Sequence, residues 1–205
     1  TGTAHTWDLT PVGQALMKDD SPVKSVLIVC FETAQRGQEV LLAGAAHSPQ
    51  VERLGLASML MRGDVSNYSQ HFGQVLATTK CLTTFSLHRI HNLVMDPICG
   101  TLHEYFAIFF IDVFFFMKIA GLNSCATLKT LALEYCKLND ADMEKLIAVI
   151  CNPNSPMKLR VLNLQGNLIT EASAPWIQFL LENSSLEAIN FQDIETLKEE
   201  FGPCR

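Results

Sequence analysis

The sequence predicts an α/β fold in which similar strand–helix units follow one another and stack into a curved solenoid. Three observations lead to this prediction. Six segments carry apolar residues at the same relative positions 0, +3 and +5. Between these segments, apolar residues recur at every third or fourth position instead of every second. The segments also return at similar intervals along the 205 residues, as expected for a repeat architecture.

The six repeated segments set the positions of the predicted strands. Alternating apolar residues are typical of a strand that buries one face. Successive segments begin 28, 31, 46, 31 and 27 residues apart, so one interval is much longer than the others. The segments are VKSVLI from Val23, VERLGL from Val51, LTTFSL from Leu82, LKTLAL from Leu128, LRVLNL from Leu159 and LEAINF from Leu186.

Short amphipathic helices are predicted between the strands. Asn139 to Asp142 and Thr170 are polar residues of the kind that cap helix starts, and Pro175 is tolerated in a first turn. Apolar residues at i, i+3 and i+4 form the stripe that each helix turns toward the core. The predicted stripes are Phe72, Val75 and Leu76; Met143, Leu146, Ile147 and Ile150; Trp176, Phe179 and Leu180; and, near the N-terminus, Val12, Ala15 and Leu16.

The units predict one domain over residues 1–205. A single strand and helix cannot bury each other's apolar faces, so each unit needs neighbours. Strands pack about 4.8 Å apart and helices about 10 Å apart, which bends the array into a concave parallel sheet with helices on the convex side. We expect about six repeats, with a helical half-repeat at 1–22, an enlarged irregular repeat at 82–127, and a last repeat with a charged tail at 186–205.

The enlarged repeat contains a Phe-rich run at 105–117, for which two interpretations stay open. The run forms the helix of its own unit, with Val113, Phe116 and Met117 facing the core, or it is an insertion that packs against the array or a partner. The longer apolar stretch 105–121 is too short to span a bilayer of about 30 Å and contains Asp112 and Lys118. No membrane insertion is therefore expected.

Strand–turn–helix units of about 28 residues resemble the leucine-rich repeat, in its ribonuclease-inhibitor-like class with outer helices. The resemblance covers nearly the whole chain and rests mainly on LKTLALEYCKLNDADMEKLIAVI and LRVLNLQGNLIT. The family consensus is LxxLxLxxN/C, which implies that Cys136 is a small buried residue. Position +8 is Cys136 and Asn167 in two units, but Phe31, Met59, Ile90 and Ile194 in the others, so a continuous Asn or Cys ladder is not expected.

The composition and the motifs argue against catalysis and nucleic-acid binding. The chain has a net charge of −6, which argues against the large basic surface that nucleic-acid binding normally requires. Seven cysteines without framework spacing indicate reduced thiols and a cytoplasmic protein. None of the GxxxxGK[ST], GxSxG or HExxH motifs occurs in the sequence. His88, His91, Cys99 and His103 are zinc-ligand types, but their spacing fits no metal template. We expect no enzyme activity, cofactor or metal.

A binding surface is predicted on the concave strand face. Residues that alternate with the apolar positions of each strand point away from the helices, and most of them are small or amide side chains. Such a surface permits close approach and hydrogen bonding to a protein partner, although tight packing in a curved sheet would also favour small residues. The candidate contact residues are Arg53, Ser86, His88, Thr130, Glu134, Asn163, Gln165, Asn190 and Gln192.

The expected function is therefore that of a protein-interaction scaffold that binds through the concave face or the Phe-rich repeat. The chain would be a subunit of a larger assembly or a fragment of a longer protein. By resemblance alone, tropomodulin-like cytoskeletal proteins, innate immune receptors and ciliary subunits use such arrays. An alternative, also by resemblance, is a GTPase-activating protein like those for Ran, which implies an arginine near the strand ends: Arg36, Arg53, Arg62 or Arg89.

Overall fold

The computed structural model describes residues 8–29, 35–57, 65–90, 98, 122 and 125–192. The fold is α/β, as predicted, and its six described strands form one parallel sheet whose spatial order is the sequence order. The strands are β1 (Ser25–Val29), β2 (Arg53–Ala57), β3 (Thr84–His88), β4 (Thr130–Glu134), β5 (Val161–Asn163) and β6 (Ala188–Asn190).

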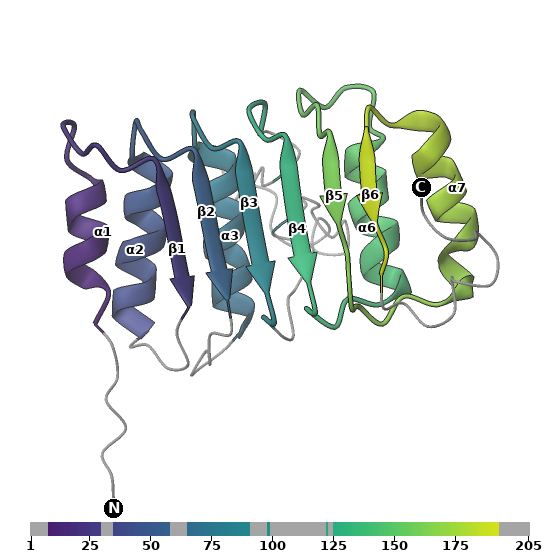
Figure 1. The fold of residues 1–205 in the computed structure, drawn as a ribbon, viewed down its shortest axis with the longest axis horizontal. Helices are drawn as coiled ribbons and strands as arrows, with labels where there is room; N and C mark the ends of the chain where they lie inside the picture. The colour runs from purple at the N-terminus through teal and green to yellow at the C-terminus, as the bar shows by residue number, and fades with distance from the viewer. Residues whose placement is uncertain are drawn as a thin grey trace, which may run out of the picture.

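The helices form a second layer on one side of the sheet (Figure 1). Each described helix lies between two strands in sequence or, for α1, precedes the first strand. The opposite face of the sheet carries no described helix. The helices are α1 (Thr10–Leu16), α2 (Gln35–His47), α3 (Val65–Thr78), α6 (Asp140–Ile150) and α7 (Ala174–Asn183), with the short 3-10 helix η2 (Glu171–Ser173) before α7.

The strand register confirms that the six segments are equivalent. Parallel pairing places the +3 residues opposite one another from β1 to β6. In the four internal segments every template residue is at most 2% exposed. A slip of one residue would turn these side chains to the other face, so their burial fixes the register. The row of +3 residues is Val26, Leu54, Phe85, Leu131, Leu162 and Ile189.

A repeated backbone hydrogen-bond pattern joins the units before their strands begin. The carbonyl of Lys24 accepts from the backbone N–H groups of both Glu52 and Arg53. The equivalent paired bonds occur at all five junctions between consecutive units, with N···O distances of 2.7–3.1 Å. Each unit therefore offers two donors to the unit before it and one shared acceptor to the unit after it.

The turns that follow β4 and β5 are held by the residues at position +8. The buried amide of Asn167 accepts from the backbone N–H groups of Cys136 and Leu138 and donates to the carbonyls of Leu133 and Leu164. Cys136 is also buried, as predicted, and its thiol donates to the carbonyls of Leu87 and Glu134. Both side chains thus link neighbouring units through backbone groups that are out of reach of water.

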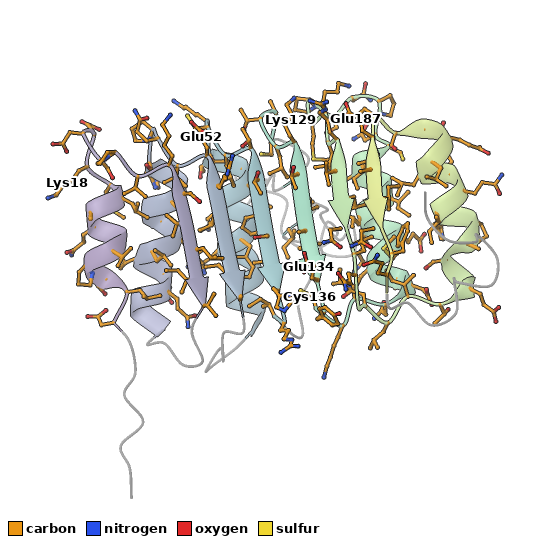
Figure 2. The ribbon with its side chains drawn as sticks, viewed as in Figure 1. Lys18, Glu52, Lys129, Glu134, Cys136 and Glu187 are labelled. Atoms are coloured by element: carbon orange, nitrogen blue, oxygen red, sulfur yellow. The ribbon has the colours of Figure 1, made fainter. Side chains whose placement is uncertain are left out.

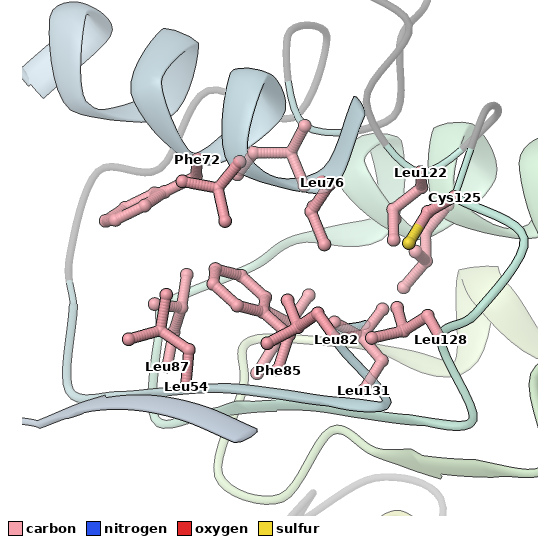
Figure 3. Packing of buried hydrophobic residues seen from close by; sticks show 14 of the residues in the cluster. Leu54, Phe72, Leu76, Leu82, Phe85, Leu87, Leu122, Cys125, Leu128 and Leu131 are labelled. Carbon is pink, nitrogen blue, oxygen red and sulfur yellow. The ribbon is translucent and has the colours of Figure 1, made fainter. Parts of the chain in front are cut away.

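The apolar core lies between the sheet and the helix layer. Two predicted helix stripes are confirmed, because Phe72, Val75 and Leu76 of α3 and all four predicted residues of α6 are buried. Figure 3 places Phe72 and Leu76 over Leu82 and Phe85 of the neighbouring strand segment. The rings of Phe72 and Phe85 meet edge to face with centroids 6.0 Å apart, a favourable aromatic geometry.

The stripe predicted for the first helix is wrong except at Leu16. Val12 and Ala15 are exposed, whereas Gly13 and Leu16 face the core. A Cβ atom on Gly44 of α2 would lie 2.3 Å from the carbonyl oxygen of Gly13. The two helices therefore pack backbone to backbone, and this close contact sets the rotation of α1 about its axis.

The stripe predicted for α7 is also wrong except at Leu180. Trp176 and Phe179 are exposed, and the buried residues are Ile177 and Leu180, in line with Ser173 of the preceding 3-10 helix. The residues at i, i+4 and i+7 face the core here. Apolar character alone therefore did not identify the core side of this helix.

The start of α6 is capped as predicted. Asn139 accepts from the backbone N–H groups of Ala141 and Asp142, and Asp142 accepts from the backbone of Asn139. Asp140 is more than a solvated cap residue, because Thr170 and Ser173 of the next unit donate hydrogen bonds to its carboxylate. Burial opposes its ionisation, but these bonds outweigh burial and lower the pKa of Asp140.

Strands β3 and β4 pair directly, from Thr84 with Thr130 to His88 with Glu134. The extra length of the enlarged repeat therefore adds no described strand between them. Several predictions lie outside the described residues: the Phe-rich run 105–117, the tail 193–205, and His91, Cys99 and His103. None of the helices that the structure describes combines the length and the apolar character needed to cross a bilayer.

Candidate partner-binding face

The sheet surface opposite the helices, here called the open face, consists of three rows of side chains across the strands. The register places seven of the nine predicted contact residues in these rows, and Gln165 and Gln192 lie two residues after the ends of β5 and β6. From β1 onward the rows are Ser25, Arg53, Thr84, Thr130, Val161 and Ala188; Leu27, Gly55, Ser86, Ala132, Asn163 and Asn190; and Val29, Ala57, His88 and Glu134.

Four of the predicted residues meet in one hydrogen-bonded group. Glu134 lies at its centre, with one carboxylate oxygen 3.1 Å from Nδ1 of His88. The other carboxylate oxygen accepts from Nδ2 of Asn163 at 2.6 Å. The side-chain oxygen of Asn163 in turn accepts from the backbone N–H of Gln165. Both oxygens of Glu134 are thus held by side chains of the two neighbouring strands.

Tyr135 completes this group, and the sequence prediction missed it. Its hydroxyl accepts from Nε2 of Gln165 at 3.1 Å, and its ring meets the ring of His88 edge to face at 5.4 Å. The guanidinium of Arg89 lies 5.7 Å from the centre of the Tyr135 ring, within cation–π range. We call His88, Glu134, Tyr135, Asn163 and Gln165 the polar cluster.

The left-handed backbone of Tyr135 explains its place in the cluster. Its φ is 52°, and the equivalent residues of neighbouring units, Arg89 and Gly166, have φ values of 55° and 68°. Each of the three donates its N–H to a carbonyl of the next unit, so the turn is a repeated feature. A Cβ on Gly166 would lie 2.3 Å from the Tyr135 ring. Glycine therefore leaves the space that the aromatic ring occupies.

The other end of the open face is apolar, which the list of candidate residues omitted. Leu27 and Val29 of β1 are 68% and 63% exposed. Their neighbours on β2 are Gly55 and Ala57, and Leu27 extends toward Gly55, where a Cβ would approach its Cδ1 to 2.8 Å. The signal was present in the sequence SVLIV, because an edge strand without polar alternation leaves apolar side chains on both faces.

The remaining predicted residues are separate from the polar cluster. Arg53 is exposed at the amino end of β2, about 13 Å along the strand from Ala57. Asn190 repeats the turn geometry of Asn163 by accepting from the N–H of Gln192. Figure 2 shows Glu134 at the carboxyl end of β4 and Lys129 near its amino end. The cluster therefore occupies the carboxyl ends of the central strands.

Of the two candidate arginines whose side chains the structure describes, Arg89 lies near the cluster and Arg53 does not. The side chain of Arg36 and the whole of Arg62 lie outside the described residues. Arg89 is exposed and directly follows β3. Its contact with the Tyr135 ring places a positive charge next to the polar cluster.

Among the described cysteines, Cys125 and Cys136 are buried, and Cys81 and Cys151 are partly exposed. Cys81, Cys125, Cys136 and Cys151 are free. Burial raises the pKa of Cys136 to about 12 and raises the pKa values of Cys125 and Cys151. A thiol with a raised pKa is a poor nucleophile at neutral pH. Within the described ranges, no three His, Cys, Asp or Glu side chains are grouped so that they could hold a metal ion.

Comparison with known proteins adds no assignment: no family model matches the chain, and no curated protein matches its sequence.

Proposed function

We propose that the chain is a non-catalytic protein-interaction module of the leucine-rich-repeat type that binds a protein partner on its open face. The assignment to this repeat class is supported by the equivalence of the six strand segments in register and backbone bonding. It is also supported by the position of Asn167, whose amide occupies the place that the repeat consensus gives to Asn. The free cysteines suit a reducing compartment such as the cytoplasm.

One observation carries the proposal: the helix-free face combines a pre-arranged polar cluster with an exposed apolar strand. Glu134 is fixed by His88 and Asn163, so binding a donor on the partner would require little further ordering of this carboxylate. Leu27 and Val29 supply exposed apolar area on the same face. A protein partner with apolar residues and hydrogen-bond donors matches this combination better than a small, uniformly polar ligand.

The test is quantitative affinity capture with the tagged full chain. The open-face variants are Leu27→Ser and the double variant Gln165→Ala/Gln192→Ala, because these changes spare the apolar core. The control is Glu144→Gln, an exposed position on α6 in the helix layer. Circular dichroism should establish that all variants fold.

We expect one captured protein whose recovery falls at least about tenfold for the open-face variants and stays unchanged for Glu144→Gln. Purified partner should then reproduce this order of affinities by calorimetry. Equal recovery of every captured protein by the wild type and all variants would contradict binding through the open face.

A further inference from the structure

Glu134 places a carboxylate on the open face that no described lysine or arginine balances. The carboxylate bonds to the imidazole of His88 and to the amide of Asn163. Within the part of the chain that the structure describes, it forms no ion pair with a lysine or arginine. The guanidinium of Arg89 contacts the ring of Tyr135 instead. The side chain of Glu134 is 27% exposed, so a group of a partner can still reach it.

Two other acidic residues at the sheet have a basic partner. Glu52 pairs with Lys24, and Glu187 pairs with Arg160, in both cases between neighbouring units. Glu52 and Glu187 are 44% and 57% exposed, so water screens their charges more than it screens the charge of Glu134. The less exposed carboxylate is therefore the one without a lysine or arginine, and a cation would interact with it more strongly.

Both oxygens of Glu134 can accept further hydrogen bonds. A carboxylate has about four lone-pair sites, and the contacts with His88 and Asn163 occupy one on each oxygen. The planar guanidinium of an arginine donates two parallel N–H groups to the two oxygens of a carboxylate, whereas the ammonium of a lysine acts as a point charge. Because the neighbouring strands already hold both oxygens, an arginine would find them ordered.

The exposed apolar side chains of β1 lie in the same rows as this carboxylate. Val29 is in line with Ala57, His88 and Glu134 across the strands β1 to β4. Leu27 and Val29 occupy alternate positions of β1 and are both exposed on the open face. One large apolar side chain of a partner can therefore contact both of them.

Small side chains lie between the apolar and the acidic feature. From Leu27 the middle row continues with Gly55, Ser86 and Ala132 on β2, β3 and β4. Positions without long side chains permit a close approach of another backbone. A peptide that crosses these strands can thus lie near the sheet while its side chains reach Leu27 at one end and Glu134 at the other.

The strand spacing sets the distance that such a peptide must span. Neighbouring strands lie about 4.8 Å apart, so the three steps from β1 to β4 cover about 14 Å. An extended chain advances about 3.4 Å per residue and presents every second residue on the same face. Residues four positions apart therefore point to the same side and are separated by about 14 Å.

We propose that the open face binds an extended peptide segment of its protein partner in which a large apolar residue and an arginine are four positions apart. The apolar side chain packs on Leu27 and Val29, and the arginine donates to both oxygens of Glu134. This inference rests on the function proposed above and adds the chemistry of the partner.

The test is selection from a displayed library of random linear peptides on the immobilised full chain. The most enriched peptide is then synthesised, and calorimetry measures its affinity for the wild type, Leu27→Ser and Glu134→Gln. The matched control is Glu144→Gln, which removes the same charge from an exposed position of α6 in the helix layer. Far-UV circular dichroism checks that each variant is folded.

We expect the enriched peptides to share an apolar residue and an arginine four positions apart. Leu27→Ser and Glu134→Gln should each weaken binding at least about tenfold, and Glu144→Gln should leave it unchanged. Replacing the arginine of the peptide by glutamine should weaken binding to the wild type to a similar extent. The same replacement should have little effect on binding to Glu134→Gln, because the two groups act as a pair.

Three results would overturn the proposal. They are enriched peptides that lack an arginine at this spacing, an arginine whose replacement weakens wild type and Glu134→Gln equally, and no enrichment at all. If Leu27→Ser still weakens peptides without the arginine, binding on the open face stands and only the chemistry of the partner is wrong. The function proposed above is judged separately, by the captured protein.

Discussion

Replacing Asn167 by alanine tests whether the units are joined as the register indicates. The amide of Asn167 reaches two successive turns. It accepts at 3.0 and 3.1 Å from the backbone N–H groups of Cys136 and Leu138, and it donates at 2.6 and 2.8 Å to the carbonyls of Leu133 and Leu164. Asn167→Ala leaves all four backbone groups without this partner. The site is buried, with Asn167 only 5% exposed.

The expected loss follows from the four bonds. A protein hydrogen bond contributes about 0.5–1.5 kcal/mol net, so losing four of them should lower the free energy of unfolding by about 4 kcal/mol. Domains are commonly stable by about 5–15 kcal/mol, so this is a large share. Asn167→Cys should lose less, because the thiol of Cys136 already donates to carbonyls at the equivalent position. It should still lose about 2 kcal/mol, since a thiol accepts poorly from two N–H groups.

The assay is urea unfolding followed by far-UV circular dichroism. Asn154→Ala, at an exposed asparagine, is the matched control and should change the free energy of unfolding by less than about 0.5 kcal/mol. The slope of the free energy against urea should be the same for all variants. Two results would refute the reasoning. One is a loss of unfolding free energy below about 1 kcal/mol for Asn167→Ala, and the other is a cysteine variant that is less stable than the alanine variant.

Three further predictions concern the apolar core, the loss of stability in acid, and the contact between α1 and α2. Leu162→Asp buries an unpaired charge at an inaccessible site and should unfold the array; an unchanged melting temperature by circular dichroism would contradict this. The lowered pKa of Asp140 means that it stabilises the fold above its unfolded pKa of about 4 and loses this effect in acid. The difference in unfolding free energy between wild type and Asp140→Asn should therefore be larger at pH 7 than at pH 3, and an equal difference would argue against it. Gly44→Ala forces a Cβ onto the carbonyl of Gly13 and should cost about 2 kcal/mol, with faster amide hydrogen exchange in α1; wild-type exchange rates there would count against the packing described.

The strand register could be read from the sequence because it depends on local pattern. In each segment the residues at +3 and +5 lie on one face of the strand, and the residue at 0 lies just before the strand. All three must face the core, whatever unit lies next to them. All internal template residues are accordingly buried. The same alternation placed His88, Glu134 and Asn163 on one face. It could not predict that Glu134 bonds to both neighbours, because this depends on side-chain rotation across three strands.

Which side of α1 and α7 faces the core could not be predicted from the pattern of apolar residues. Trp176 and Phe179 of α7 are apolar but exposed, and in α1 the core side includes Gly13, which no scale of hydrophobicity selects. Burial in an array depends on which elements of neighbouring units cover a helix, and the pattern within one helix does not show this.

The sequence by itself determined the α/β class, the six strands, their equivalence and the face on which the candidate contact residues lie, because each follows from the period of apolar residues along a short segment. Only the tertiary structure decided that Tyr135 joins the polar cluster, since its position follows from a left-handed turn and from the space left by Gly166 in the next unit. It also decided which apolar residues of α1 and α7 are exposed. Both outcomes are set by contacts between units, and a pattern within one unit carries no information about them.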